Sequence, residues 1–80
     1  MTAPVVVDAL GAYCPVPIRL LERALRRVPV GATVILLADD PLVEMDLTAW
    51  CHENRHDLLS LTRDAGEYRG EVRRGARRVM

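Results

Sequence analysis

The fold is decided by residues 5–28, which read VVVDALGAYCPVPIRLLERALRRV. The β-branched run Val5–Asp8 leads into a turn near Gly11, a pattern typical of a short strand followed by a loop. Over Ile18–Val28 the apolar residues recur every three or four positions, with arginine and glutamate between them, which predicts an amphipathic helix. Pro29 follows, as is common just beyond a helix end. The stretch therefore predicts a strand, a loop and a helix.

The rest of the chain continues this alternation. Thr33–Ala38 is a short β-prone run and predicts a second strand. Asp40-Pro41 has the pattern of a helix cap followed by a first-turn proline, and the helical spacing that begins there ends near Asn54–His56. Leu58–Asp64 and Tyr68–Arg74 flank a turn and predict a hairpin.

The predicted order is β-α-β-α-β-β, which indicates an α/β (α+β) fold. A parallel pair joined by a crossover helix, followed by a hairpin, gives a four-stranded mixed sheet with two helices on one face, a two-layer sandwich. We expect one domain over residues 1–80, with its core at about 5–74 and a loose tail at 75–80. In the last strand one face is formed by Tyr68, Gly70 and Val72.

The composition excludes several classes of function. The 80 residues carry 11 basic and 11 acidic side chains and no net charge, which argues against direct binding to nucleic acid. Every basic residue is arginine, so Schiff-base chemistry on a lysine is excluded. Only three aromatic residues are available to stack on bases. No stretch is long and apolar enough for a membrane span, and the start lacks the features of a secretory leader, so we expect a cytoplasmic protein that does not bind a membrane.

Cys14 lies where the first strand leads into the first helix. If Cys14 is the N-cap, Pro15 is the first helical residue and Pro17 the third, positions where the missing amide costs little. The thiol would then face the positive end of the helix dipole and the amides of Val16 and Ile18. This placement predicts a Cys14 pKa below the ordinary value of about 8.5, and therefore a nucleophilic thiolate that could hold a sulfur atom as a persulfide.

The two cysteines also have simpler interpretations. Free cysteine is often a small buried apolar residue, so Cys14 could be no more than a structural cap. Cys51 lies in the middle of the second predicted helix and is expected in the core. Two cysteines at this separation predict neither a disulfide scaffold nor a metal-binding pair.

Two other groups of polar residues could form sites. His52 and His56 have the spacing of a helical metal pair, but suitable further ligands are lacking, so we expect no metal, and His56 is better explained as a charge at the helix end. Asp40 and Asp46 are more simply explained as a helix cap and a surface charge than as an acid pair.

Two surfaces could bind other proteins. The basic side of the first helix is either a solvated face or a docking patch for an acidic partner, in which Arg19 and Arg23 would take part. The strand at 33–38 is apolar on both faces, so Ile35 and Leu37 are expected to be exposed and to support weak homo-oligomer formation or partner docking.

The motif residues resemble those of a known family. Asp8, Gly11 and Cys14-Pro15-Val16-Pro17 are similar to the D-x-x-G-x-x-C-P-x-P signature of the TusA-like sulfur-carrier proteins. The resemblance covers roughly residues 5–74. Its further landmarks are Gly31, Thr33–Ala38, Asp40-Pro41, Asp46, Cys51 and His56-Asp57-Leu58-Leu59.

The resemblance implies a two-layer sandwich and a sulfurtransferase that needs no cofactor. Cys14 would accept sulfane sulfur as a persulfide from a donor, either a cysteine desulfurase or a rhodanese, and pass it to an acceptor protein. In the family such sulfur reaches tRNA thiolation, molybdenum-cofactor biosynthesis or oxidative sulfur metabolism. The alternative is a non-catalytic interaction or regulatory module of the same fold, in which Cys14 is only a structural helix cap.

Overall fold

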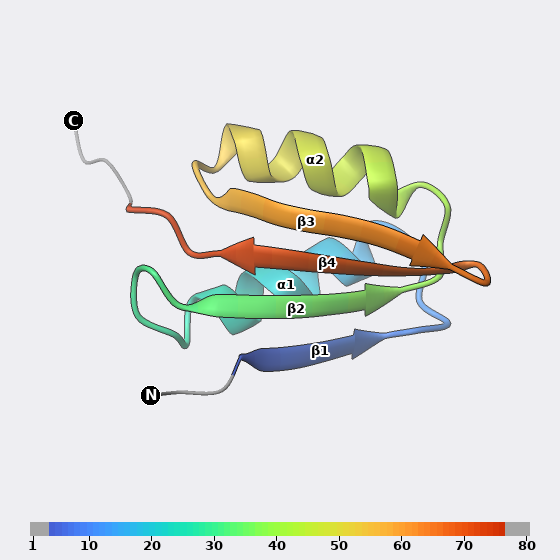
Figure 1. Ribbon diagram of the computed structural model, residues 1–80, viewed down its shortest axis with the longest axis horizontal. Coiled ribbons are helices and arrows are strands. Elements are labelled where there is room, and N and C mark those ends of the chain that lie inside the picture. The colour runs from blue at the N-terminus through green and yellow to red at the C-terminus, as the bar shows by residue number, and fades with distance from the viewer. Residues whose placement is uncertain (1–3, 77–80) are drawn as a thin grey trace.

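The computed structural model describes residues 4–76 and contains six elements in the predicted order (Figure 1). The strands are β1 (Val5–Ala9), β2 (Thr33–Ala38), β3 (Asp57–Asp64) and β4 (Glu67–Arg73), and the helices are α1 (Val16–Leu25) and α2 (Val43–Glu53). Each strand boundary lies within one residue of its prediction.

The four strands form one mixed sheet in the order β1-β2-β4-β3. β1 and β2 are parallel, with Ala9 opposite Ala38, so both strands end at the same edge of the sheet. β4 is antiparallel to β2 and to β3. The loops that follow β1 and β2 therefore leave the sheet side by side, and this places the site described below.

The two helices pack on the same side of the sheet and touch each other (Figure 1). The shared core joins apolar side chains of both helices to those of β1, β2 and β4, among them Ala9, Leu21, Leu36, Leu47 and Val72. The core is aliphatic, as the composition predicts, and among the described residues every buried side-chain nitrogen or oxygen has a hydrogen-bond partner.

Gly70 lets α2 approach the sheet closely. It lies on the buried face of β4, between the buried Tyr68 and Val72, as the alternation in the sequence predicts. A Cβ atom at Gly70 would come 2.6 Å from Leu47 Cδ2. A side chain at this position would therefore push α2 away from β4.

The helix-free face of β2 differs from its prediction. Ile35 is only 6% exposed, although no helix covers it. Its direct cross-strand neighbours are Val6 on β1 and Glu71 on β4, and side chains at such positions cover one another. Leu37 is half-buried. The expectation that Ile35 is exposed is therefore wrong.

Helix α1 ends earlier than its apolar pattern predicts. It starts at Val16 and ends at Leu25, although the apolar pattern continues to Val28. Beyond Leu25 the amides of Arg27 and Val28 donate to the carbonyls of Ala24 and Leu25, so the last turn tightens into three-residue spacing.

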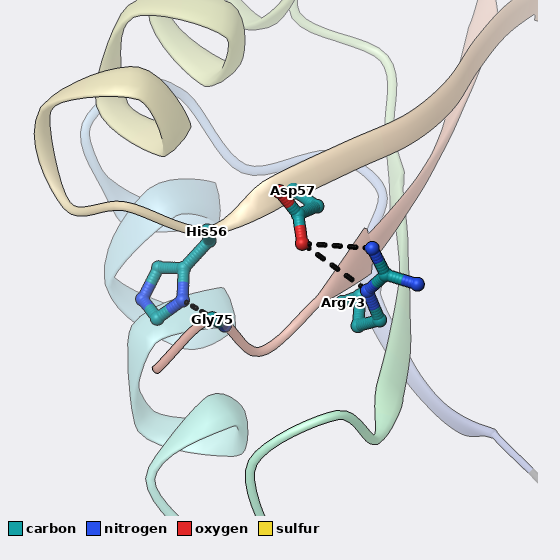
Figure 2. Close-up of polar contacts among 4 residues, drawn as sticks. All are labelled: His56, Asp57, Arg73 and Gly75. Carbon is teal, nitrogen blue, oxygen red and sulfur yellow. Dashed lines mark hydrogen bonds and ion pairs between the residues drawn. The ribbon is translucent and has the colours of Figure 1, made fainter. Parts of the chain in front are cut away.

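The segment after β4 is attached to the start of β3 (Figure 2). Arg73 donates from Nε and Nη2 to Asp57 Oδ2 at 3.1 and 3.0 Å, and the Gly75 amide donates to His56 Nδ1 at 3.1 Å. A Cβ at Gly75 would overlap the Arg55 carbonyl, so this close approach requires glycine. The predicted loose tail thus has an attached beginning at Gly75, and its positions 77–80 lie outside the described residues.

Candidate functional site

The candidate site lies at the edge of the sheet where β1 and β2 end. Two neighbouring aspartates in the loop after β2 bind the backbone of the loop after β1. The Gly11 amide donates to Asp39 Oδ1 at 3.0 Å, and the Cys14 amide donates to Asp40 Oδ2 at 2.8 Å. In open α/β sheets, ligands commonly bind beyond the carboxyl ends of the strands. The two loops therefore form one fixed unit that carries Cys14.

Cys14 itself is half-buried. It packs against a small core cluster formed by Ala38, Val43 and Tyr68, which come from β2, α2 and β4. Side chains from three elements thus pack against Cys14, while part of the residue remains open to solvent.

The predicted helix cap at Cys14 is wrong by one residue. Pro15 is the N-cap of α1, the helix begins at Val16, and no side chain caps it. The Val16 amide donates to the Tyr13 carbonyl at 2.8 Å and is therefore not free to bind the thiolate. Because Cys14 lies outside the first turn, the helix dipole acts on it only weakly.

The predicted low pKa of Cys14 is also wrong. The pKa of the Cys14 thiol is raised to about 12, first by burial, then by the Asp46 carboxylate and lastly by Asp40. Both carboxylates favour the protonated thiol and oppose the thiolate.

Asp40 has a different role from the predicted helix cap. Helix α2 begins at Val43 with Leu42 as N-cap. Asp40 is buried, and its Oδ1 accepts from the Leu42 amide at 3.1 Å while Oδ2 accepts from Cys14. These two amides lower the pKa of Asp40, so its carboxylate stays ionised. Asp40 thus joins the Cys14 loop to the start of α2.

Asp46 is an exposed residue of α2, as its interpretation as a surface charge predicts, and its negative charge raises the pKa of Cys14. This effect on the thiol could not be predicted from the sequence, since Asp46 lies 32 positions from Cys14 in the chain. In the fold, Val43 contacts the cluster that holds Cys14, and Asp46 follows one turn later on the same side of α2.

Cys51 is a core residue, as predicted. It is 1% exposed, within the main apolar cluster. Burial, followed by the charge of Asp57, raises its pKa to about 11. Of the two cysteines, only Cys14 is partly open to solvent.

We expect Cys51→Ser to lower the free energy of unfolding by about 1 to 3 kcal/mol, because it buries a hydroxyl among apolar side chains. The buried thiol also gives the wild type a pH dependence. The pKa of the Cys51 thiol in the unfolded chain is about 8.5. Because burial favours the neutral thiol in the folded protein, its contribution to the free energy of unfolding is complete below that pH and is lost as the pH rises toward the folded pKa. Urea unfolding of both proteins at neutral and alkaline pH measures both effects. Equal stability of the two proteins at neutral pH would refute the core assignment.

The two histidines have separate environments. The ring of His56 stacks on Trp50 with centroids 5.2 Å apart. Its Nδ1 accepts a hydrogen bond from the Gly75 amide (Figure 2). Burial and then Arg74 lower the pKa of His56, so the interpretation of His56 as a positive charge at the helix end is wrong. His52 is exposed. Within residues 4–76, no three His, Cys, Asp or Glu side chains are grouped in a way that could hold a metal ion.

The basic side of α1 is exposed. Arg19 and Arg23 lie one turn apart along the helix, beginning in its first turn, and both are open to solvent. Arg26 pairs with Glu22 at 3.4 Å, as predicted for residues four apart. This pair is exposed and contributes little stability. Arg19 and Arg23 therefore remain candidates for binding a partner.

Comparison with known proteins identifies the family. The profile described as "Sulfurtransferase TusA" matches residues 5–74, which include every element and both loops of the site. The chain belongs to the TusA sulfurtransferase family. A SirA-like protein from Desulfitobacterium hafniense has a similar structure, with a TM-score of 0.78 and 23% sequence identity, over 90% of this chain and 99% of that one. This likeness confirms the fold.

Membership of the TusA family confirms the resemblance drawn from the motif residues and supports a general role in carrying sulfur between proteins. Neither α1 nor α2, the helices within residues 4–76, is long and apolar enough to cross a membrane.

Proposed function

We propose that this protein is a sulfur carrier that accepts sulfane sulfur on Cys14 as a persulfide and passes it to an acceptor protein. The observation that carries the proposal is the contrast between the two thiols. Cys14 is half-buried on a loop held by Asp40, whereas Cys51 is closed inside the core. Pro15, Val16 and Pro17 support the loop as it enters α1.

The transfer step balances without an added oxidant or cofactor. The Cys14 sulfur attacks the outer sulfur of a donor persulfide, R–S–SH. A new S–S bond forms at Cys14 and the donor S–S bond breaks, and the bonding electrons leave with the donor sulfur. That sulfur takes up the proton that Cys14 has lost, so the products are Cys14–S–SH and R–SH. Release to an acceptor thiol reverses the same exchange.

Exposed apolar side chains around the site support a protein partner. Large residues of the two loops and of the helix starts are between 40% and 78% exposed. They are Leu10, Tyr13, Val16, Leu42 and Met45. Apolar and aromatic side chains of this kind form the centres of protein interfaces. A donor or acceptor protein could bury them while it reaches Cys14.

The test is the intact mass of the protein after incubation with a purified cysteine desulfurase and cysteine. We expect a gain of one sulfur, which a reductant removes and which an acceptor thiol also discharges. A non-catalytic module of the same fold would keep its original mass. An unchanged mass with this donor and with a persulfide-loaded rhodanese would refute the carrier function.

We further propose that Arg19 and Arg23 guide the donor to the site. Exposed charges steer encounter, and their effect weakens with salt. Arg19→Glu together with Arg23→Glu should slow sulfur loading about tenfold at low salt and less at high salt. Arg63→Glu, an exposed arginine on β3, serves as the matched control. Loading rates that respond neither to these substitutions nor to ionic strength would refute this role.

The relay is proposed to operate in the cytoplasm, where a reducing environment keeps both thiols free. Its acceptor would serve tRNA thiolation, molybdenum-cofactor biosynthesis or oxidative sulfur metabolism. Weak self-association through the helix-free face around Leu37 is a separate proposal. Light scattering of the parent and of Leu37→Asp over a range of concentrations tests it, and a strictly monomeric parent would refute it.

A further inference from the structure

Tyr13, the residue before Cys14, exposes its side chain between two neighbours that pack inward. Ala12 packs against the main core, and Cys14 packs against the smaller cluster that supports it. Tyr13 is 78% exposed, the largest exposed fraction of any large apolar side chain in residues 4–76. Because the side chains on both sides of it are held in the core, the Tyr13 ring is left in solvent beside the thiol.

The backbone around Tyr13 is fixed by hydrogen bonds. The Ala12 amide donates to the Ala9 carbonyl at 3.1 Å, and the Val16 amide donates to the Tyr13 carbonyl at 2.8 Å. The two aspartates of the loop after β2 hold the same segment through its amides. Tyr13 is therefore presented from a fixed loop before any partner binds, and this lowers the entropic cost of binding.

The fold uses the other two aromatic residues of the chain but not Tyr13. Tyr68 is 6% exposed in the core, and Trp50 stacks on His56 and packs against the main core. A tyrosine side chain offers a large contact area with only two χ angles, so ordering it at an interface costs little entropy. Tyrosine is also enriched among the residues that dominate binding energy at protein interfaces. The placement of Tyr13 therefore favours burial by a partner.

We propose that Tyr13 is a specificity-determining residue, whose ring a sulfur donor protein buries when its persulfide reaches Cys14. This inference rests on the proposed function of Cys14. Consecutive Cα atoms are about 3.8 Å apart, so a donor protein whose sulfur bonds to Cys14 brings its surface against Tyr13 as well. The donor surface that fits this side chain is an apolar pocket with a polar group at its rim for the phenol hydroxyl.

The test measures the initial rate of sulfur loading as the concentration of the carrier is varied. The donor is the one that loads the wild type, either a purified cysteine desulfurase with cysteine or a persulfide-loaded rhodanese. The wild type is compared with Tyr13→Ala and Tyr13→Phe. Val30→Ala is the matched control, because Val30 is 57% exposed in the loop before β2, at the end of that strand opposite Cys14.

Two further measurements separate docking from chemistry and from folding. Loading from glutathione persulfide, a small donor, reports the reactivity of Cys14 without the docking of a protein. Urea unfolding reports the stability of each variant. A residue that acts only through the thiol or the fold would change one of these two results.

We expect Tyr13→Ala to raise the KM for the carrier about thirtyfold while kcat changes little, because an interface anchor acts on binding. Tyr13→Phe should raise KM by at most about threefold, since it keeps the ring and loses only the hydroxyl. All three variants should match the wild type in loading from glutathione persulfide and in urea unfolding.

Three results would overturn the inference. They are an unchanged KM for Tyr13→Ala, an equal rise in KM for Tyr13→Phe or Val30→Ala, and slower loading of Tyr13→Ala from glutathione persulfide. The failure of the proposed function would look different. If the wild type gains no sulfur from either protein donor, the carrier function fails, and the role of Tyr13 fails with it. If the wild type loads and Tyr13→Ala loads with the same KM, only the inference about Tyr13 is refuted.

Discussion

Cys14→Ser is expected to abolish sulfur loading completely while the fold remains intact. A serine oxygen cannot form a stable sulfane sulfur adduct, so the loss should be total rather than partial. The bond that fixes the loop runs from the backbone amide of residue 14 to Asp40 and does not depend on the side chain. Intact mass after incubation with a cysteine desulfurase measures loading, and urea unfolding measures the fold.

Cys51→Ser is the control for this substitution, because it removes the other thiol. It should load sulfur as the wild type does, despite its lower stability. Full loading of Cys14→Ser would show that the active thiol is wrongly assigned.

The second large effect is expected for Asp40→Ala, which should slow sulfur loading about a hundredfold. The carboxylate binds the amides of Cys14 and Leu42 at the same time, so its loss releases the Cys14 loop from the start of α2. A displacement of about 1 Å at a reacting atom can cost this much. Alkylation by a small reagent should rise instead, because a carboxylate that opposes the thiolate is also removed.

Asp40→Asn is the conservative comparison, since it retains one acceptor oxygen for two amides and should load at an intermediate rate. Two backbone amides lower the pKa of Asp40. The ionised carboxylate therefore stabilises the folded protein fully above the ordinary aspartate pKa of about 3.9, and this stabilisation is lost only as the pH falls through the lowered pKa. Loading by Asp40→Ala at the wild-type rate would contradict the role of this tether.

The element order could be predicted from the sequence because each element carries its own local pattern. The run Thr33–Ala38 is apolar and ends at acidic residues, and β2 has those bounds. The alternation at Tyr68, Gly70 and Val72 correctly gave the buried face of β4. Such patterns depend on residues close together in the chain, and packing reinforces them here.

The electrostatics of the site could not be predicted in this way. The prediction of a low Cys14 pKa depends on the local chain alone, in which a helix follows the thiol. The true environment is set by Asp40 and Asp46, which are brought in by a second loop and a second helix. The burial of Ile35 was missed for a similar reason, since its cover comes from strands that are distant in sequence.

The central claim is that Cys14 carries the sulfur, and locating a labelled sulfur atom tests it most directly. The wild-type protein would be incubated with a cysteine desulfurase and cysteine containing a heavy sulfur isotope, and then digested without a reductant for peptide mapping by mass spectrometry. We predict that the label lies on the peptide containing Cys14 and leaves it when an acceptor thiol is added. Label on the Cys51 peptide, or no label on either peptide, would contradict the claim.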